Sequence, residues 1–382
     1  MASVFLTPPC IISGENALEL ASSRLALLGK KALVVTDSTL VRLGVTSYFT
    51  RILEEAGVAY SIYGKVDTEP TDLVVMEAAD QYRRENCDFF AAVGGGSPID
   101  TMKAAGILTA CGGKLSGYMG KSITTALPPM AAVPTTAGTG SEATQFTIIT
   151  DTETQVKMLL KGPSLIPGLA IVDPVFTLTA PKKITAATGV DALTHAIEAF
   201  TSKQAQPMSD TFALSAAKRI FEFLPVVYRE PDNRNARAQM AIAATEAGIA
   251  FNNSSVTLVH GMSRPIGALF HVPHGLSNAV LLEVCLRFAL PGAVERFAEL
   301  ARRCCGISEA DDMAAAGALV KSVSDLLRTL EIPTLQEFGI PSVELEARIP
   351  KMARDAYASG SPGNTRRETG IPEMEALYRQ LL

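Results

Sequence analysis

The first half of the chain alternates short apolar runs with amphipathic helical runs, and this alternation constrains the fold more than any other feature. The apolar runs have the length and hydrophobicity of buried strands: Lys31–Asp37, Val58–Tyr63, Phe89–Val93, Pro128–Pro134 and Ala170–Pro174. Helical patterns follow, as in the amphipathic run through Ala56 and the run from Thr71 to Glu85. Strands that alternate with helices of this length predict a parallel, doubly wound sheet of Rossmann-like type. Thr147–Asp151 and Val156–Leu160 add a predicted β-hairpin.

A helical pattern replaces this alternation from about Ile184 onward. Apolar residues spaced i, i+3, i+4, i+7 predict helices over Ser209–Leu224, Asn233–Phe251, Val294–Cys304 and Asp311–Leu330. The change of pattern near Pro181 predicts two domains. We expect an α/β domain over residues 1–181 and an all-helical domain over residues 182–382.

Composition excludes several classes of protein. The chain has 382 residues, of which 47% are hydrophobic and 19% charged, so it can bury large cores. A net charge of −5 and the lack of a basic run argue against nucleic acid as a partner.

No apolar stretch reaches the roughly 18 uncharged residues of a membrane span, and the first residues do not resemble a signal peptide. The six cysteines lack zinc or disulfide spacing. We therefore expect a cytoplasmic protein with reduced thiols.

All four histidines of the chain lie between Gly189 and Gly275. Asp191 and His195 are four residues apart in a run with no helix breaker, so they share one face of a helix. His260 and His274 are each followed by a glycine and are expected at neighbouring helix ends. One carboxylate and three imidazoles suit Fe²⁺ or Zn²⁺ and contain too much nitrogen for Ca²⁺ or Mg²⁺. The alternative is that these histidines only cap helices or fill the core, but their clustering favours a metal site.

Two glycine-rich turns each follow a predicted strand. The first is Gly94-Gly95-Gly96-Ser97-Pro98-Ile99-Asp100, and the second is Pro134-Thr135-Thr136-Ala137-Gly138-Thr139-Gly140-Ser141-Glu142. Glycines let the backbone approach a pyrophosphate, whose charge is stabilised by free N–H groups and the helix dipole. A plain tight turn is the alternative for either motif alone. Two such turns after two strands of one sheet favour a dinucleotide.

Asp37 ends the predicted strand that begins at Lys31. A carboxylate at that position can accept hydrogen bonds from the adenosine ribose and would repel a 2′-phosphate, which favours NAD over NADP. The alternative is that Asp37 is the N-cap of the following helix, and the two roles are compatible.

Several of these motifs together resemble the iron-dependent (group III) alcohol dehydrogenases. The resemblance is carried by Gly189-Val190-Asp191-Ala192-Leu193-Thr194-His195-Ala196-Ile197-Glu198, by His260-Gly261-Met262, by Pro273-His274-Gly275-Leu276-Ser277-Asn278 and by both glycine-rich turns. It runs from Asp37 to the loop Ser359-Gly360-Ser361-Pro362-Gly363-Asn364.

The resemblance implies a set of site residues. The metal ligands would be Asp191, His195, His260 and His274, with Fe²⁺ as the metal and Zn²⁺ as the alternative. Residues of the family that contact NAD correspond to Asp37, Gly94, Gly95, Gly96, Ser97, Asp100, Thr135, Thr136, Thr139, Ser141 and Lys157. Lys157 would reach the nicotinamide ribose, although it could equally be a solvated surface lysine. Phe146 and Phe251 would line the substrate pocket, with ordinary core packing as their alternative.

The activity implied is hydride transfer between a small primary alcohol, or its aldehyde, and NAD, with the metal acting as a Lewis acid. We further expect a homodimer or a higher homo-oligomer. A lyase resembling dehydroquinate synthase, a zinc-dependent polyol dehydrogenase and a non-catalytic metal- or nucleotide-binding protein remain alternatives.

The chain departs from the family at Arg264, where many members carry a second histidine that faces the nicotinamide. A guanidinium cannot relay protons near neutral pH, so His271 becomes the candidate general base. Arg264 could clamp a carboxylate, sulfonate or phosphonate of the substrate. It could instead reach the cofactor pyrophosphate, or form a salt bridge with a helix carboxylate such as Glu246.

Overall fold

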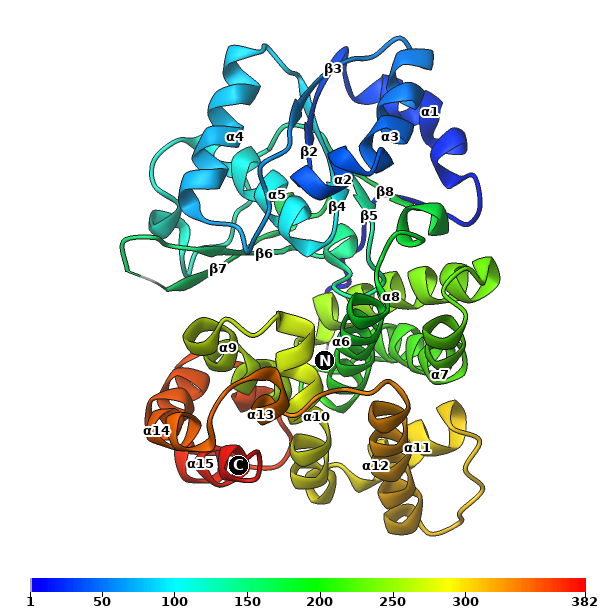
Figure 1. The fold of residues 1–382 in the computed structure, drawn as a ribbon, viewed down its shortest axis with the longest axis vertical. Coiled ribbons are helices and arrows are strands. Elements are labelled where there is room, and N and C mark those ends of the chain that lie inside the picture. Colours follow the sequence, from blue (N-terminus) through cyan, green and yellow to red (C-terminus); the bar gives the residue numbers. More distant parts are fainter. Residues whose placement is uncertain (1, 155) are drawn as a thin grey trace. The chain divides into compact units, whose positions relative to one another are not determined.

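The computed structural model describes residues 2–154 and 156–382, which form two compact units (Figure 1). The first unit is Leu6–Ala180, and the second contains Pro181–Leu382 together with the short segment that ends at Phe5. The division along the chain therefore falls between Ala180 and Pro181.

A six-stranded parallel sheet forms the centre of the first unit (Figure 1). Its strand order is β1-β8-β5-β4-β2-β3. The strands are β1 (Cys10–Ser13), β2 (Lys31–Val35), β3 (Ala59–Tyr63), β4 (Phe89–Gly94), β5 (Met130–Pro134) and β8 (Leu169–Val172). The helices are α1 (Ala17–Leu28), α2 (Ser38–Arg42), α3 (Val45–Glu55), α4 (Asp72–Arg84) and α5 (Gly96–Cys111). The predicted α/β architecture is confirmed.

Alternate side chains of β2 enter two separate hydrophobic cores, because successive residues of a strand point to opposite faces. Leu33 and Val35 pack with residues of α4 and α5. Ala32 and Val34 pack with residues of α1 and α3. Both faces of the sheet are therefore covered by helices, as parallel sheets require.

Two elements differ from the sequence prediction. The strand β1 is not predicted, because it is short, lies at the edge of the sheet and buries only Ile12 fully. The single amphipathic run expected after β2 is two helices, α2 and α3, which are separated at Gly44. Gly44 has φ 74°, a left-handed conformation that ends one helix before the next begins.

A β-hairpin forms a separate two-stranded sheet in the first unit, as predicted. The antiparallel strands β6 (Phe146–Thr150) and β7 (Lys157–Lys161) pair so that Phe146 lies opposite Lys161. Short 3₁₀ helices, η1 (Leu115–Tyr118), η2 (Ser141–Ala143), η3 (Pro163–Leu165) and η4 (Pro174–Thr177), connect these elements.

The second unit is helical, and the predicted helices are confirmed. It contains α6 (Lys182–Thr201), α7 (Pro207–Arg229), α8 (Arg234–Ser254), α9 (Leu258–Phe270), α10 (His274–Ala289), α11 (Val294–Cys304), α12 (Asp312–Thr329), α13 (Leu335–Phe338), α14 (Ser342–Ala358) and α15 (Ile371–Arg379). The 3₁₀ helices η5 (Leu290–Gly292) and η6 (Ser361–Asn364) complete it. The central helix α6 packs against α7, α8 and α10, so that its residues after Thr188 are buried.

One helical segment, His274–Gly292, is long and apolar enough to cross a membrane by length and composition alone. It contains the ion pair Arg287–Glu283, and α10 packs against α6, α9 and α12. A helix with these neighbours is a core helix of the helical unit.

Candidate metal centre and glycine-rich turns

The metal centre predicted from the histidines begins on α6. Asp191 and His195 lie one helical turn apart, and both are buried. His195 Nε2 is 4.0 Å from Asp191 Oδ1. The helix period alone places these two groups together.

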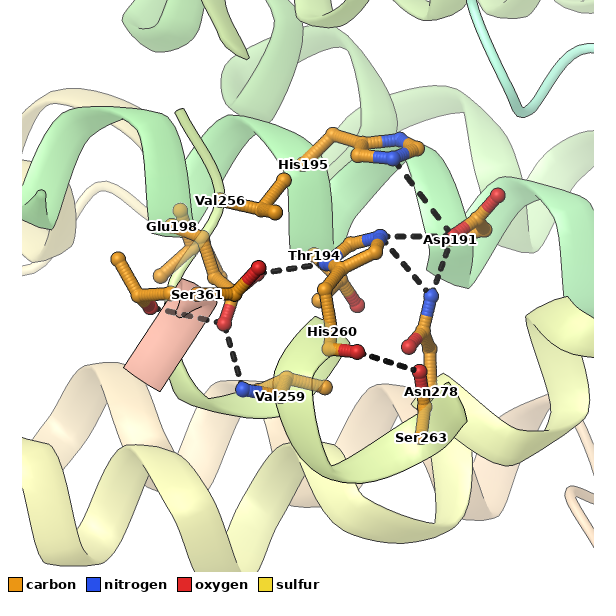
Figure 2. A network of polar contacts seen from close by, with 12 residues as sticks. Asp191, Thr194, His195, Glu198, Val256, Val259, His260, Ser263, Asn278 and Ser361 are labelled. Atoms are coloured by element: carbon orange, nitrogen blue, oxygen red, sulfur yellow. Dashed lines mark hydrogen bonds and ion pairs between the residues drawn. The ribbon is translucent and has the colours of Figure 1, made fainter. Parts of the chain in front are cut away.

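His260 reaches the same carboxylate from the first turn of α9 (Figure 2). Its Nε2 is 3.5 Å from Asp191 Oδ1, and its ring stacks on that of His195 with centroids 4.4 Å apart. A Cβ atom on Gly261 would lie 2.5 Å from Pro362 of η6, so glycine at this position permits the close approach of η6 to α9. Asp191, His195 and His260 offer ligand atoms that all lie within 4.8 Å of one another.

His274 begins α10 and supplies the fourth predicted ligand. Its Nε2 is 3.7 Å from Asp191 Oδ1, and its side chain is 36% exposed. A Cβ atom on Gly275 would lie 2.6 Å from the carbonyl oxygen of Ala187, so glycine lets the start of α10 contact α6. All three imidazole Nε2 atoms therefore surround a single carboxylate oxygen, Asp191 Oδ1, at distances of 3.5–4.0 Å.

Two further residues, which belong to the quoted sequence motifs but have no role assigned there, hold these groups in place (Figure 2). Glu198 accepts a hydrogen bond from His260 Nδ1 at 2.6 Å, and also from Thr257 Oγ1 and the Val259 N–H. Asn278 Nδ2 donates to Asp191 Oδ1 at 2.6 Å and lies 3.1 Å from His260 Nε2 and 3.3 Å from His274 Nε2. Helix spacing could have indicated both residues, since Glu198 is three residues after His195 and Asn278 is four after His274.

The charges of the cluster are strongly coupled. Burial lowers the pKa of His195 to about 3, so its imidazole is neutral and offers a lone pair. Burial alone would also lower the pKa of His260, but Glu198 and Asp191 outweigh it and raise that pKa to about 9. Burial opposes ionisation of Asp191, yet the three histidines hold the pKa of its carboxyl well below the usual range. A metal ion bound at His260 Nε2 would displace a proton, while Glu198 continues to hold the Nδ1–H.

The donor set fits a divalent transition metal. It combines one carboxylate with three imidazoles, and the second nitrogen of His260 is hydrogen-bonded to a carboxylate, as is usual for metal-binding histidines. His195 Nδ1 and Asn278 Oδ1 are buried with no hydrogen-bond partner among the described residues. A cation held by the three Nε2 lone pairs and Asp191 Oδ1 would give this buried cluster a charge partner, while the unpaired His195 Nδ1 and Asn278 Oδ1 lie outside that donor set.

The aromatic residues expected in the substrate pocket lie in different units. Phe251 on α8 stacks on His195, with ring centroids 4.2 Å apart. Phe146 begins β6 in the sheet-containing unit. The structure therefore brings Phe251 to the histidine cluster, whereas the role of Phe146 in the pocket remains a prediction.

His271 and Arg264 occupy different positions on α9. His271 is the exposed C-cap, with φ 54°, and its backbone N–H donates to Gly267 O. Arg264 is one turn beyond His260, is half-buried and donates from Nη1 to Ser361 Oγ at 3.1 Å. The alternative salt bridge between Arg264 and Glu246 is wrong, because Glu246 instead pairs with Arg219 at 3.3 Å and accepts a hydrogen bond from Ser215.

The two glycine-rich turns lie next to each other in the sheet-containing unit. They follow the adjacent strands β4 and β5, in which Gly94 is paired with Pro134. A Cβ atom on Gly95 would lie 3.3 Å from Thr136 Oγ1, and one on Gly96 would lie 3.0 Å from Thr139 Cγ2. A side chain at either glycine would therefore require the threonine opposite it to shift. Carboxyl ends of parallel strands followed by a helix N-terminus form the usual position of a phosphate site.

Three other predicted cofactor residues have partners of their own. Asp37 is the N-cap of α2 and accepts from the Leu40 N–H at 2.8 Å. Asp100 Oδ2 accepts from the Ile148 N–H at 2.9 Å, and burial raises the pKa of the Asp100 carboxyl to about 6. Lys157 on β7 pairs with Glu69 at 2.8 Å. None of these contacts tests their predicted roles toward NAD.

The fold and the buried carboxylate–imidazole cluster define a metalloprotein with an α/β unit and a helical unit. Comparison with known proteins adds its family. Residues 8–174 match the family described as Iron-containing alcohol dehydrogenase, and residues 185–382 match the Fe-containing alcohol dehydrogenase family, C-terminal. The chain belongs to the iron-containing alcohol dehydrogenase family, as its motifs predict.

Individual relatives extend over nearly the whole chain. The NAD-dependent methanol dehydrogenase of Bacillus methanolicus is 37% identical over 365 residues, which are 94% of this chain and 95% of that protein. The crystal structure of a 1,3-propanediol oxidoreductase superposes with a TM-score of 0.96 at 37% identity and covers 100% of both chains. The sulfoacetaldehyde reductase from Bifidobacterium kashiwanohense, in complex with NAD⁺, superposes with a TM-score of 0.87 at 30% identity and covers 100% of this chain and 99% of the other.

Proposed function

We propose that the protein is an iron- and NAD(H)-dependent dehydrogenase that interconverts a small primary alcohol and its aldehyde. The observation that carries this proposal is the convergence of three imidazole Nε2 atoms on Asp191 Oδ1, at 3.5–4.0 Å, in a member of this family. The two touching glycine-rich turns support a dinucleotide, and relatives with NAD in their names or structures support NAD.

When bound, iron supplies Lewis acidity toward the alcohol oxygen, and the nicotinamide exchanges a hydride with the carbinol carbon. Asp191, His195, His260 and His274 would hold the metal. Glu198 holds the proton on His260 Nδ1 and so keeps Nε2 directed toward the cluster. The Phe251 ring covers one face of His195 and keeps water from it. We retain His271, an exposed residue, as the candidate that passes the alcohol proton to solvent.

A panel of short alcohols and aldehydes tests the activity. The metal-free protein is reconstituted with Fe²⁺ or with Zn²⁺, and NADH is followed by its absorbance. We expect stoichiometric NADH formation from at least one simple primary alcohol, with a higher rate for Fe²⁺. Binding of NADH without turnover of any panel member would contradict the proposal and favour a non-catalytic binding protein. Conversion of a substrate with no net NADH formation would favour a lyase.

Cofactor preference provides a second test, centred on Asp37. Its Oδ1 caps α2, which leaves Oδ2 to accept from a ribose hydroxyl and to repel a 2′-phosphate. Asp37→Gly should raise the ratio of kcat/KM for NADP to that for NAD by about tenfold, equivalent to about 1.4 kcal/mol. Asp37→Asn keeps the N-cap while removing the charge, so it should give most of the same change. A wild-type enzyme that already prefers NADP would rule out this role for Asp37.

We also propose a cytoplasmic homo-oligomer, a homodimer or larger. The six cysteines are all free, as in a reducing compartment. Leu20 and Leu27 of α1 are 71% and 84% exposed, and such apolar side chains are suited to a contact between subunits. Light scattering on the purified protein measures the number of subunits.

A more specific substrate class, an aldehyde or alcohol with an anionic group, is favoured by Arg264. This guanidinium is half-buried one turn from His260 and donates to Ser361 Oγ. Burial lowers the pKa of Arg264, and the negative charge of Glu198 offsets only part of that shift. No carboxylate lies within ion-pair distance of Arg264 among residues 2–154 and 156–382. One structural relative is named for the reduction of a sulfonated aldehyde. A cation in this position is suited to bind a carboxylate or sulfonate.

Kinetics of Arg264→Met test this specificity. The KM for an anionic aldehyde should rise by about tenfold or more, because a charge-assisted hydrogen bond is lost, whereas the KM for a neutral aldehyde of equal length should change little. Arg219→Met is the control, since its guanidinium pairs with Glu246 and should not discriminate between the two aldehydes. Equal losses on both aldehydes, or a raised KM for NADH alone, would return Arg264 to a structural or cofactor role.

A further inference from the structure

A lysine on α5 is completely buried in the sheet-containing unit. Lys103 has 0% exposure, and its Nζ donates to the Thr144 carbonyl oxygen at 2.8 Å, to Thr144 Oγ1 at 3.1 Å and to the Phe146 carbonyl oxygen at 2.9 Å. These three bonds use all the donors of an ammonium group. Burial lowers the pKa of Lys103 to about 8, and the negative charges of Asp100 and Glu142 oppose that shift. The side chain is therefore protonated at neutral pH, although burying its charge is costly.

The bonds of Lys103 join two parts of the chain that each follow a glycine-rich turn. Lys103 lies on α5, whose first turn contains Gly96 and Ser97. Thr144 directly follows η2 and Phe146 begins β6, so this segment leads from the second turn into the hairpin. One helical turn earlier on α5, Asp100 reinforces the link, because its carboxylate accepts from the Ile148 N–H and its carbonyl oxygen accepts from Thr147 Oγ1.

We propose that Lys103 is a positioning residue for the dinucleotide. Its ammonium group fixes the spacing between the start of α5, the Thr135–Ser141 turn and the hairpin that carries Lys157. The predicted phosphate and ribose contacts in this unit lie on those three segments, except Asp37 and Gly94, the last residue of β4. The inference rests on the proposed use of NAD(H), but it concerns a residue that does not touch the cofactor.

The geometry explains why a buried cation is used. Neutral hydrogen bonds between α5 and an irregular segment would be weaker than charge-assisted bonds from one ammonium group. Loss of the ammonium would also leave the carbonyl oxygens of Thr144 and Phe146 buried without these donors, which would drive local rearrangement of the segment. A small displacement of contact groups is sufficient to weaken binding strongly, even when it originates away from the ligand.

Three variants with graded effects test the proposal. Lys103→Met removes all three bonds and keeps the length of the side chain. Thr144→Val removes only the hydroxyl acceptor, at nearly constant volume. Thr101→Val is the matched control: Thr101 has 0% exposure and lies on the same helix, and its Oγ1 has no hydrogen-bond partner among the described residues.

NADH affinity is measured by fluorescence titration at a temperature where each variant is folded, together with iron content. We expect Kd for NADH to rise by about tenfold or more in Lys103→Met, less in Thr144→Val and not at all in Thr101→Val, with unchanged iron content. If Lys103→Met does not fold, the comparison of Thr144→Val with Thr101→Val decides. Equal affinities across the folded variants, or equal losses in Thr101→Val and Thr144→Val, would overturn the positioning role. A wild-type protein that does not bind NADH would instead overturn the proposed cofactor.

Discussion

Replacement of His260 by alanine should remove the bound iron and lower turnover by about two orders of magnitude or more. His260 is central to the cluster: its Nε2 lies 3.5 Å from Asp191 Oδ1, and its ring stacks on His195. Its loss would leave three of the four predicted ligands and would also leave the Glu198 carboxylate without one of its two closest partners. Iron content by mass spectrometry and kcat with the best alcohol of the panel measure the two effects.

His271→Ala is the control for iron content. It removes a histidine of the same helical region that lies outside the cluster and is exposed, so the variant should retain wild-type iron. Thermal unfolding of both variants separates metal loss from unfolding. Full activity of a rigorously metal-free wild-type protein, or retention of iron by His260→Ala, would contradict the assignment of the ligand set.

The second large effect is expected at a residue that is not a predicted ligand. Glu198→Gln should weaken iron binding by about 10–100-fold. The carboxylate accepts a 2.6 Å hydrogen bond from His260 Nδ1 and fixes which ring nitrogen is free for the metal. Burial disfavours the charge of Glu198, yet His260 and Thr257 keep its pKa below the usual value. A neutral amide would withdraw this charge and make His260 a weaker ligand.

Chelator competition at a fixed pH measures the affinity of Glu198→Gln for Fe²⁺. Glu246→Gln is the matched control, because Glu246 is a partly buried glutamate of the same helical unit that pairs with Arg219 instead of a histidine. Its iron affinity should equal that of the wild type. An unchanged affinity in Glu198→Gln would show that packing alone orients His260.

Local geometry explains how much of the site is predictable. Asp191 and His195 meet because residues four apart share a helix face, and this relation holds in any fold that keeps the run helical. The two glycine-rich turns are recognisable because each follows an apolar run with the length of a strand in a parallel sheet. The helical second half follows in the same way from its i, i+3, i+4, i+7 spacing. The weak edge strand β1 escapes prediction because it has almost no buried face of its own.

Motif resemblance supplies what spacing cannot. His260 and His274 are 14 residues apart on different helices, and no local rule places them at Asp191. Their clustering with Asp191 and His195 along the chain favours a metal site, and the resemblance to the iron-containing family assigns all four residues to one metal. It also identifies Arg264 as a departure, although not what its side chain contacts.

The sequence by itself determined the two kinds of domain, the positions of the turns and the residue types of the metal site, because these depend on periodicities within single elements. Only the tertiary structure decided which distant groups meet. It pairs His260 with Glu198, Asp191 with Asn278 and Arg264 with Ser361, and it places Lys103 against the segment that leads into the hairpin. Such pairs are separated by 41–97 residues and are set by how helices and strands pack. Packing depends on the shapes of whole faces, so it leaves no short pattern in the sequence.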